Sequence, residues 1–155
     1  MSHPNTADGG PAVHLGQDDG ECFRLGPLEI IVKENGSGTR MHLAVAEFRG
    51  SNFRIPPHIH TEHDETIYVL EGRMGVMLGE RTFTATAGSS FTIPVHVPHA
   101  IWNESGARVR FLNVIVAARY LDYFREMAAA ATTSLPPPDV IARVMGRYGL
   151  QPVKQ

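Results

Sequence analysis

Histidines gather in two short segments of this sequence, and their spacing suits a metal site. The first segment, PHIHTEHDE at residues 57–65, holds His58 and His60 two positions apart and ends at Glu65. On a β-strand, alternate side chains point to the same face, so both imidazoles would face one side. A turn after His60 would return Glu65 on the following strand. Two imidazoles and one carboxylate suit a divalent first-row metal, iron(II) or manganese above all.

The second segment, PVHVPH at residues 94–99, can supply a third imidazole, His99, from a neighbouring strand. Pro94 and Pro98 restrict the turn that presents His99. His96 lies in the same turn and is a further catalytic candidate. An H-x-H pair alone also fits ordinary strand histidines, but the joint spacing of the two segments favours a metal site. For His63, in the loop between the segment's ligands, we expect an exposed side chain, with an acid or base near the metal as the alternative.

Short strands separated by turn residues must position these side chains. Turn signals recur along residues 22–116, among them Asn35-Gly36-Ser37-Gly38 and the pair Gly79-Glu80, which suits a two-residue hairpin. Strands are predicted over residues 28–34, 40–48, 53–60, 65–70, 74–78, 81–86, 90–93, 99–103 and 109–116. Many short strands at regular spacing indicate an all-β sandwich or barrel.

The character of the chain changes after residue 116. Apolar residues recur at helical spacing over residues 117–131 and again over 139–148, with three consecutive prolines between the two runs. Both predicted helices are amphipathic, so they need a surface to dock on: the outside of the barrel, its mouth or a second subunit. We therefore expect a flexible leader (1–20), a β-barrel (21–116) and a C-terminal helical appendage (117–155).

The spacing of these residues resembles the two conserved motifs of the cupin superfamily. The first motif, G-x5-H-x-H-x3,4-E-x6-G, is matched at His58, His60, Glu65 and Gly72, and the second, G-x5-P-x-G-x2-H-x3-N, at Gly88, Pro94, His99 and Asn103. Two positions depart from the pattern. Gly50 lies two residues too early for the opening glycine of the first motif, and His96 replaces the inner glycine of the second. Neither departure touches a ligand position, and the resemblance covers about residues 40–116.

The resemblance implies an all-β double-stranded β-helix, the cupin jelly-roll barrel, followed by two short C-terminal helices. It further implies one divalent transition metal inside the barrel, held by His58, His60, Glu65 and His99. Fe²⁺ or Mn²⁺ is favoured, while Ni²⁺, Co²⁺, Cu²⁺ and Zn²⁺ can use the same ligands. In quercetin dioxygenase-like cupins, the residue equivalent to Glu65 also loosens from the metal and acts as a base. Asn103 is expected to be a structural hydrogen-bonding residue.

A metal-dependent enzyme with a small-molecule substrate is the leading functional hypothesis. The reaction would be a dioxygenase-type oxidation of an enolic or phenolic compound, with Glu65 removing the hydroxyl proton. The same site could instead serve an oxygen-independent cyclase, dehydratase or isomerase, as in cupins that act on aromatic polyketides. A non-catalytic small-molecule-binding barrel is a further alternative, and a sugar isomerase or epimerase is favoured less because the sequence has no phosphate-binding loop.

Composition excludes several other classes of protein. The net charge of −2 and the lack of a basic run argue against a nucleic-acid partner. No apolar run approaches the ~20 residues that a membrane helix needs. The single cysteine, Cys22, excludes an internal disulfide and favours the cytoplasm, and we expect it to be buried. Residues 66–70 are apolar on both faces of their predicted strand, which suggests cover from the second sheet, a C-terminal helix or another subunit. On the last of these alternatives we expect a homodimer.

Overall fold

The computed structural model describes residues 12–116, 119–131 and 135–153. The first part of the predicted leader and the predicted start of the first helix, residues 117–118, lie outside these ranges. The elements in chain order are β1 (Cys22–Leu25), β2 (Leu28–Asn35), β3 (Leu43–Gly50), β4 (Phe53–His60), β5 (Glu65–Glu71), β6 (Arg73–Leu78), β7 (Arg81–Thr86), β8 (Ser90–Ile93), β9 (His99–Asn103), β10 (Val109–Val116), α1 (Tyr120–Ala130), α2 (Pro138–Arg147) and β11 (Leu150–Pro152).

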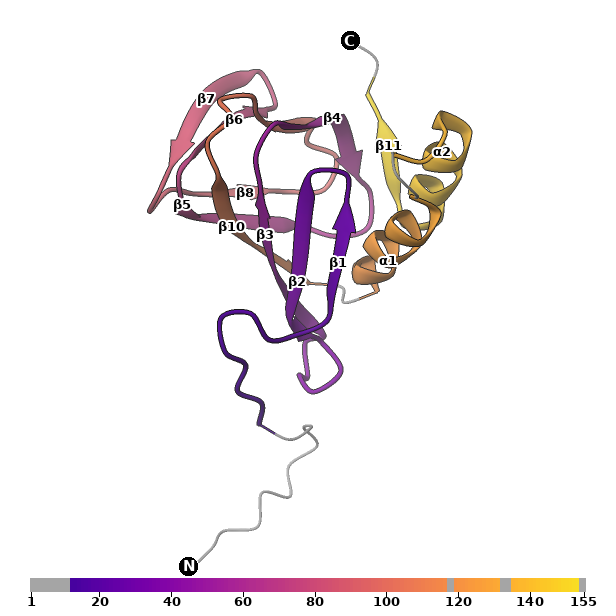
Figure 1. Ribbon diagram of the computed structural model, residues 1–155. Helices are drawn as coiled ribbons and strands as arrows, with labels where there is room; N and C mark the ends of the chain where they lie inside the picture. Colours follow the sequence, from indigo (N-terminus) through magenta and orange to yellow (C-terminus); the bar gives the residue numbers. More distant parts are fainter. Residues whose placement is uncertain (1–11, 117–118, 132–134, 154–155) are drawn as a thin grey trace, which may run out of the picture.

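The strands form two antiparallel sheets (Figure 1). One sheet has six strands in the order β1-β2-β3-β10-β5-β8, and the other has five in the order β11-β4-β9-β6-β7. Strands that are distant in sequence pair side by side, such as β3 with β10 and β4 with β9. This crossing between sheets is typical of a jelly roll. The predicted all-β jelly roll with two short C-terminal helices is therefore confirmed.

Period-two alternation determines which side chains enter the interior. Along β10, Val109, Phe111, Asn113 and Ile115 are buried while the residues between them are at least partly exposed. The neighbouring strand β5 alternates in the same way and buries Glu65. Because β10 and β5 are paired, two polar side chains, Asn113 and Glu65, enter an interior that is otherwise mostly apolar.

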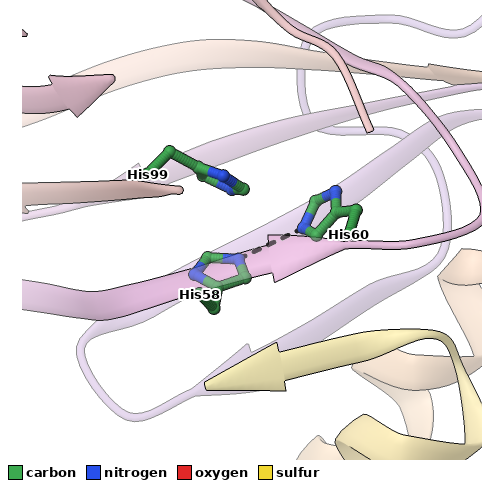
Figure 2. Close-up of side chains that lie close together, drawn as sticks. All are labelled: His58, His60 and His99. Atoms are coloured by element: carbon green, nitrogen blue, oxygen red, sulfur yellow. Dashed lines mark hydrogen bonds between the residues drawn. The ribbon is translucent and has the colours of Figure 1, made fainter. Parts of the chain in front are cut away.

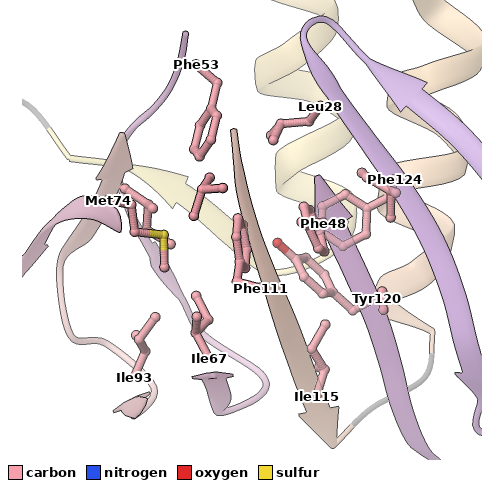
Figure 3. Close-up of a cluster of buried hydrophobic side chains, with 14 of the residues drawn as sticks. Leu28, Phe48, Phe53, Ile67, Met74, Ile93, Phe111, Ile115, Tyr120 and Phe124 are labelled. Carbon is pink, nitrogen blue, oxygen red and sulfur yellow. The ribbon is translucent and has the colours of Figure 1, made fainter. Parts of the chain in front are cut away.

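Aromatic side chains join the barrel to the C-terminal helices (Figure 3). Phe48 stacks on Phe111 with ring centroids 5.1 Å apart, and Phe124 of α1 meets Phe48 edge-on at 5.3 Å. Such pairs contribute about 0.5–1.5 kcal/mol each beyond the burial of their area. Leu121 is also fully buried, so α1 is part of the core and not a loose appendage.

The chain after α2 ends in a strand that the sequence did not suggest. β11 pairs with the end of β4, placing Leu150 opposite His60 and Pro152 opposite His58. Gly149 allows the entry to β11, since it has φ +69° and a side chain there would strike Thr61 and Glu62. The helices and β11 thus lie at the end of the barrel where β4 delivers its histidines (Figure 1).

Cys22 begins β1, an edge strand, and is exposed, so the expectation that it is buried is wrong. Within the described ranges, neither helix has the length and apolar character needed to cross a membrane.

Candidate metal centre

An irregularity in β4 turns two histidines into the barrel. In the pairing of β4 with β9, Ile55 lies opposite Ile101 and His58 lies opposite His99. Between these two pairs β4 therefore contains one residue more than β9. Pro56 and Pro57 occupy this β-bulge, where missing backbone N–H groups do no harm. Before the bulge the odd-numbered residues Phe53 and Ile55 face the interior, and after it His58 and His60 do.

Three imidazoles converge inside the barrel (Figure 2). His58, His60 and His99 are all buried, and each offers a nitrogen such that these atoms lie within 4.8 Å of one another. His58 Nε2 and His60 Nε2 are 3.1 Å apart, and the rings of His60 and His99 are almost perpendicular at a centroid distance of 4.8 Å. The predicted convergence of these three histidines is confirmed, and their positions suit binding of a metal ion.

Backbone carbonyls orient two of these rings. His58 Nδ1 donates to the carbonyl oxygen of Pro56 at 2.9 Å, and His99 Nδ1 donates to that of Val97 at 3.0 Å. A carbonyl can only accept, so Nδ1 carries the hydrogen and Nε2 keeps a lone pair. This arrangement is typical of metal-bound histidines, whose second nitrogen is held by an outer hydrogen bond.

The burial of the cluster keeps its imidazoles neutral. Desolvation lowers the pKa of His58. It also lowers the pKa of His60 to about 2 and that of His99 to about 4, and repulsion from neighbouring histidines adds to the effect on these two. Among the described residues, His60 Nδ1 and His99 Nε2 are buried without a hydrogen-bond partner. Neutral, unpartnered nitrogens are what a divalent ion requires, so the residues present fit a transition metal.

Glu65 lies beside the three histidines at the start of β5. Its Oε2 is 3.9 Å from His60 Nδ1 and 3.7 Å from His99 Nε2, beyond hydrogen-bond distance, while Asn113 Nδ2 donates to its Oε1. Burial raises the pKa of Glu65 to about 7, although the Asn113 hydrogen bond acts in the opposite direction. The structure brings Glu65 to the cluster, and its role as a fourth ligand stays a prediction.

The other two histidines of the segments have different surroundings. His63 is buried, so the expectation of an exposed loop residue is wrong: its ring packs 4.4 Å from His60 and 4.3 Å from Tyr120. Asp64 holds this loop in place by accepting a hydrogen bond from the Val95 amide at 2.9 Å. His96 is exposed and is not among the residues that line the cavity described below, so the structure does not bring this catalytic candidate to the site.

The backbone of His96 explains a departure from the cupin pattern. Its φ is +64°, in the left-handed region where glycine is at home, and its amide donates to the carbonyl of His60 at 2.8 Å. The turn therefore has the conformation that glycine would favour, although a histidine occupies it. Asn103 has the structural role expected, since its side chain bonds Ala107 and Ser105 in the turn after β9.

A cavity of about 740 Å³ extends from this cluster toward the C-terminal helices. Its inner end is lined by His58, Glu65, His99 and Asn113, and its outer part by apolar side chains of the β1–β2 turn, α1 and α2. Of the predicted docking places for the helices, the barrel mouth is thus the one observed. The size and apolar walls suit a drug-sized organic ligand.

Tyr120 and Tyr123 on α1 also line this cavity, and sequence reasoning missed both. Tyr120 is buried, with its ring 5.2 Å from His60 and stacked on Tyr123 at 5.3 Å. On sequence alone, the apolar face of α1 is a core pattern, and nothing in its spacing points to a site formed mainly by strands.

The cavity has little positive charge. Among the described residues that line it, Arg54 is the only lysine or arginine. Its guanidinium is paired with Glu104 at 2.8 Å and lies 5.1 Å from the centre of the Trp102 ring. The walls therefore offer no uncommitted cation for a phosphate or carboxylate group.

Comparison with known proteins agrees with this architecture. A family model described as "Cupin domain" matches residues 44–115. The polyketide cyclase RemF from Streptomyces resistomycificus is 28% identical with a TM-score of 0.59, and the match covers 68% of this chain and 79% of that one. An RmlC-like cupin from Shewanella frigidimarina NCIMB 400 is 22% identical with a TM-score of 0.58, covering 70% and 94%. The search of curated proteins gave no match.

Proposed function

The chain belongs to the cupin superfamily, and on that premise we propose that it is a metal-dependent enzyme that acts on a small, uncharged organic substrate. The reaction we propose is a dioxygenase-type oxidation of an enolic or phenolic compound. One observation carries the proposal: a buried cluster of three neutral histidines and a carboxyl group opens onto a large apolar cavity.

His58, His60 and His99, together with Glu65, would hold the metal. When bound, a divalent ion such as Fe²⁺ or Mn²⁺ supplies Lewis acidity and redox chemistry at the inner end of the cavity. The protein contributes the orientation of the His58 and His99 rings, which the carbonyls of Pro56 and Val97 hold so that the Nε2 lone pairs point into the cluster.

Glu65 is suited to move a proton between itself and a substrate hydroxyl. A general base works best when its pKa is near the working pH, and burial brings the pKa of Glu65 to about 7. Asn113 holds Oε1, which leaves Oε2 as the oxygen that faces the histidines and can accept a proton. Asn113 is thus a positioning residue for Glu65.

The cavity walls favour an uncharged, mostly apolar substrate. Phe48, Phe53 and Phe111 line it together with aliphatic residues, and Arg54 is engaged elsewhere. Away from a metal at the inner end, the charge of a phosphorylated sugar or a small dicarboxylate would find no partner in the cavity, and burying it would carry a large cost. A phenol or enol loses little on entering and meets polar groups only at the inner end.

An oxygen-independent cyclisation, dehydration or isomerisation is the second candidate. The likeness to a polyketide cyclase at 28% identity over 68% of the chain favours it specifically. The same carboxyl group could remove a proton beside a carbonyl in such a reaction. Oxygen consumption during turnover of an enolic substrate separates the two candidates.

Metal content measured by inductively coupled plasma mass spectrometry tests the proposal first. We expect about one equivalent of a transition metal in the wild type, as a single three-histidine centre requires, and loss of it in His99→Ala. His14→Ala, which changes an exposed histidine outside the cavity, is the matched control and should keep its metal. A wild type that holds no metal even after reconstitution would refute the metalloenzyme and leave a binding barrel.

A further inference from the structure

We infer that Tyr120 of helix α1 contacts the substrate, and that its hydroxyl donates a hydrogen bond to a substrate oxygen held beside Glu65. The inference rests on the proposed function and deepens it, because it adds a helical residue to the site and defines the substrate's polar end. That end would carry two neighbouring oxygens, one as a hydroxyl facing Glu65 and one as an acceptor facing Tyr120.

Tyr120 is fixed in position by its neighbours. Its ring lies 4.3 Å from His63, 5.2 Å from His60 and 4.9 Å from Phe124. Tyr123, one helical turn later, stacks on it with nearly parallel planes, at an angle of 3°. A side chain packed on four rings has little rotational freedom, so its hydroxyl is preorganised.

Within the described part of the chain, the hydroxyl of Tyr120 has no hydrogen-bond partner. The residue is 4% exposed, yet no described residue forms a hydrogen bond with its oxygen, whereas the hydroxyl of Tyr148 donates to Glu126 at 2.6 Å. Figure 3 shows the Tyr120 oxygen directed away from α1, toward Phe111 in the interior. The Tyr120 oxygen is not among the fully buried atoms that lack a partner, so it keeps access to the cavity that Tyr120 lines, where a ligand atom can accept its hydrogen bond.

Tyr120 and Glu65 line the same cavity and offer complementary chemistry. A tyrosine phenol keeps its hydrogen at neutral pH and can donate it. Ionised Glu65 can only accept. A donor and an acceptor in one apolar cavity match a catechol or an enol beside a carbonyl, which offers one hydroxyl and one further oxygen.

The test uses the full-length protein loaded with Mn²⁺, without oxygen, and 4-nitrocatechol as the probe, followed by its visible absorption. We expect Tyr120→Phe to weaken binding about tenfold, the effect of one hydrogen bond in a buried site. Tyr68→Phe makes the same change on an exposed side chain of β5 that does not line the cavity, and it should bind like the wild type. The Mn²⁺ content should be equal in all three proteins.

A second probe separates hydrogen bonding from packing. 4-Nitrophenol has a single phenolic oxygen, which Glu65 would take, so Tyr120→Phe should bind it as well as the wild type does. Equal losses for both probes, or no loss for 4-nitrocatechol, would overturn the inference and leave the metal centre standing. A wild type that holds Mn²⁺ but does not bind 4-nitrocatechol would refute the phenolic substrate class and the inference together, whereas one that holds no Mn²⁺ would refute the proposed function itself.

Discussion

Replacing Asn113 with leucine should make the stability of the metal-free protein more sensitive to alkaline pH. Asn113 is the described donor to the buried Glu65, and leucine keeps a similar volume without the amide. Burial already raises the pKa of Glu65 from 4.5 to about 7. A hydrogen bond to a charged group contributes about 1.5–3 kcal/mol, so losing it should raise this pKa by a further one to two units, roughly.

Proton linkage determines whether Glu65 stabilises or destabilises the folded protein as pH rises. A carboxyl whose pKa is higher in the folded state imposes no cost below its unfolded pKa, where both states are protonated. As pH rises from 4.5 to about 7 the wild type loses about 3 kcal/mol through this group, and the loss then stops. In Asn113→Leu the pKa of Glu65 is higher, so stability continues to fall at pH values above about 7. The difference in unfolding free energy between the wild type and this variant should therefore widen by about 1.5–3 kcal/mol between about pH 6 and pH 9.

Urea denaturation in the presence of EDTA measures this gap at each pH, and the carbon resonance of the Glu65 carboxyl group reports its pKa directly. Thr92→Val, which removes the exposed Thr66–Thr92 hydrogen bond on the same sheet, should show a small gap that does not vary with pH. A gap for Asn113→Leu that stays constant across this pH range would refute the role assigned to Asn113.

Three further predictions concern residues away from the cavity. His96→Gly should leave metal content unchanged and raise the free energy of unfolding by up to about 1 kcal/mol, since glycine accepts its φ of +64°; loss of metal would show that the imidazole takes part after all. Glu47→Gln should cost about 2–4 kcal/mol at neutral pH, because Glu47 is buried between Arg49 and Arg110, each at 2.7 Å. Burial acts to raise the pKa of Glu47, but the hydrogen bonds from both arginines lower it overall. The denaturation curves of the wild type and Glu47→Gln should therefore converge as pH falls below about 4.5. The exposed Leu70 suggests a homodimer that forms through β5. Light scattering should detect this dimer in the wild type and a monomer in Leu70→Asp. A monomeric wild type would contradict the prediction.

The strands and the three histidines could be predicted because their signals are local. The predicted strand over residues 53–60 coincides with β4, and those over 99–103 and 109–116 coincide with β9 and β10. Side chains alternate between the two faces of a strand, so the two-residue spacing of His58 and His60 is enough to predict that both lie on the same face. The second motif added His99 on the adjacent strand, and the structure pairs it directly with His58.

The remaining features depend on contacts between distant parts of the chain. Tyr120 reaches the site only because α1 docks on the barrel mouth, and helical periodicity does not say where a helix docks. β11 has three residues and no pattern of its own, and it exists because β4 offers it an edge. His63 is buried by the ring of Tyr120, so its burial could not be predicted before the helix was placed.

The extra residue at Pro56-Pro57 reverses the alternation of side chains along β4: odd-numbered residues face the interior before the bulge, and even-numbered residues face it after the bulge. Deleting one of these two prolines would shift the register of one half of β4 by one residue. Either His58 and His60 would leave the interior and Ile59 would enter it, or Phe53 and Ile55 would turn outward. The hydrophobic core and the histidine cluster are therefore kept in phase by a single insertion. In a related chain, the length of this short segment would tell whether an H-x-H pair faces inward before any ligand is sought.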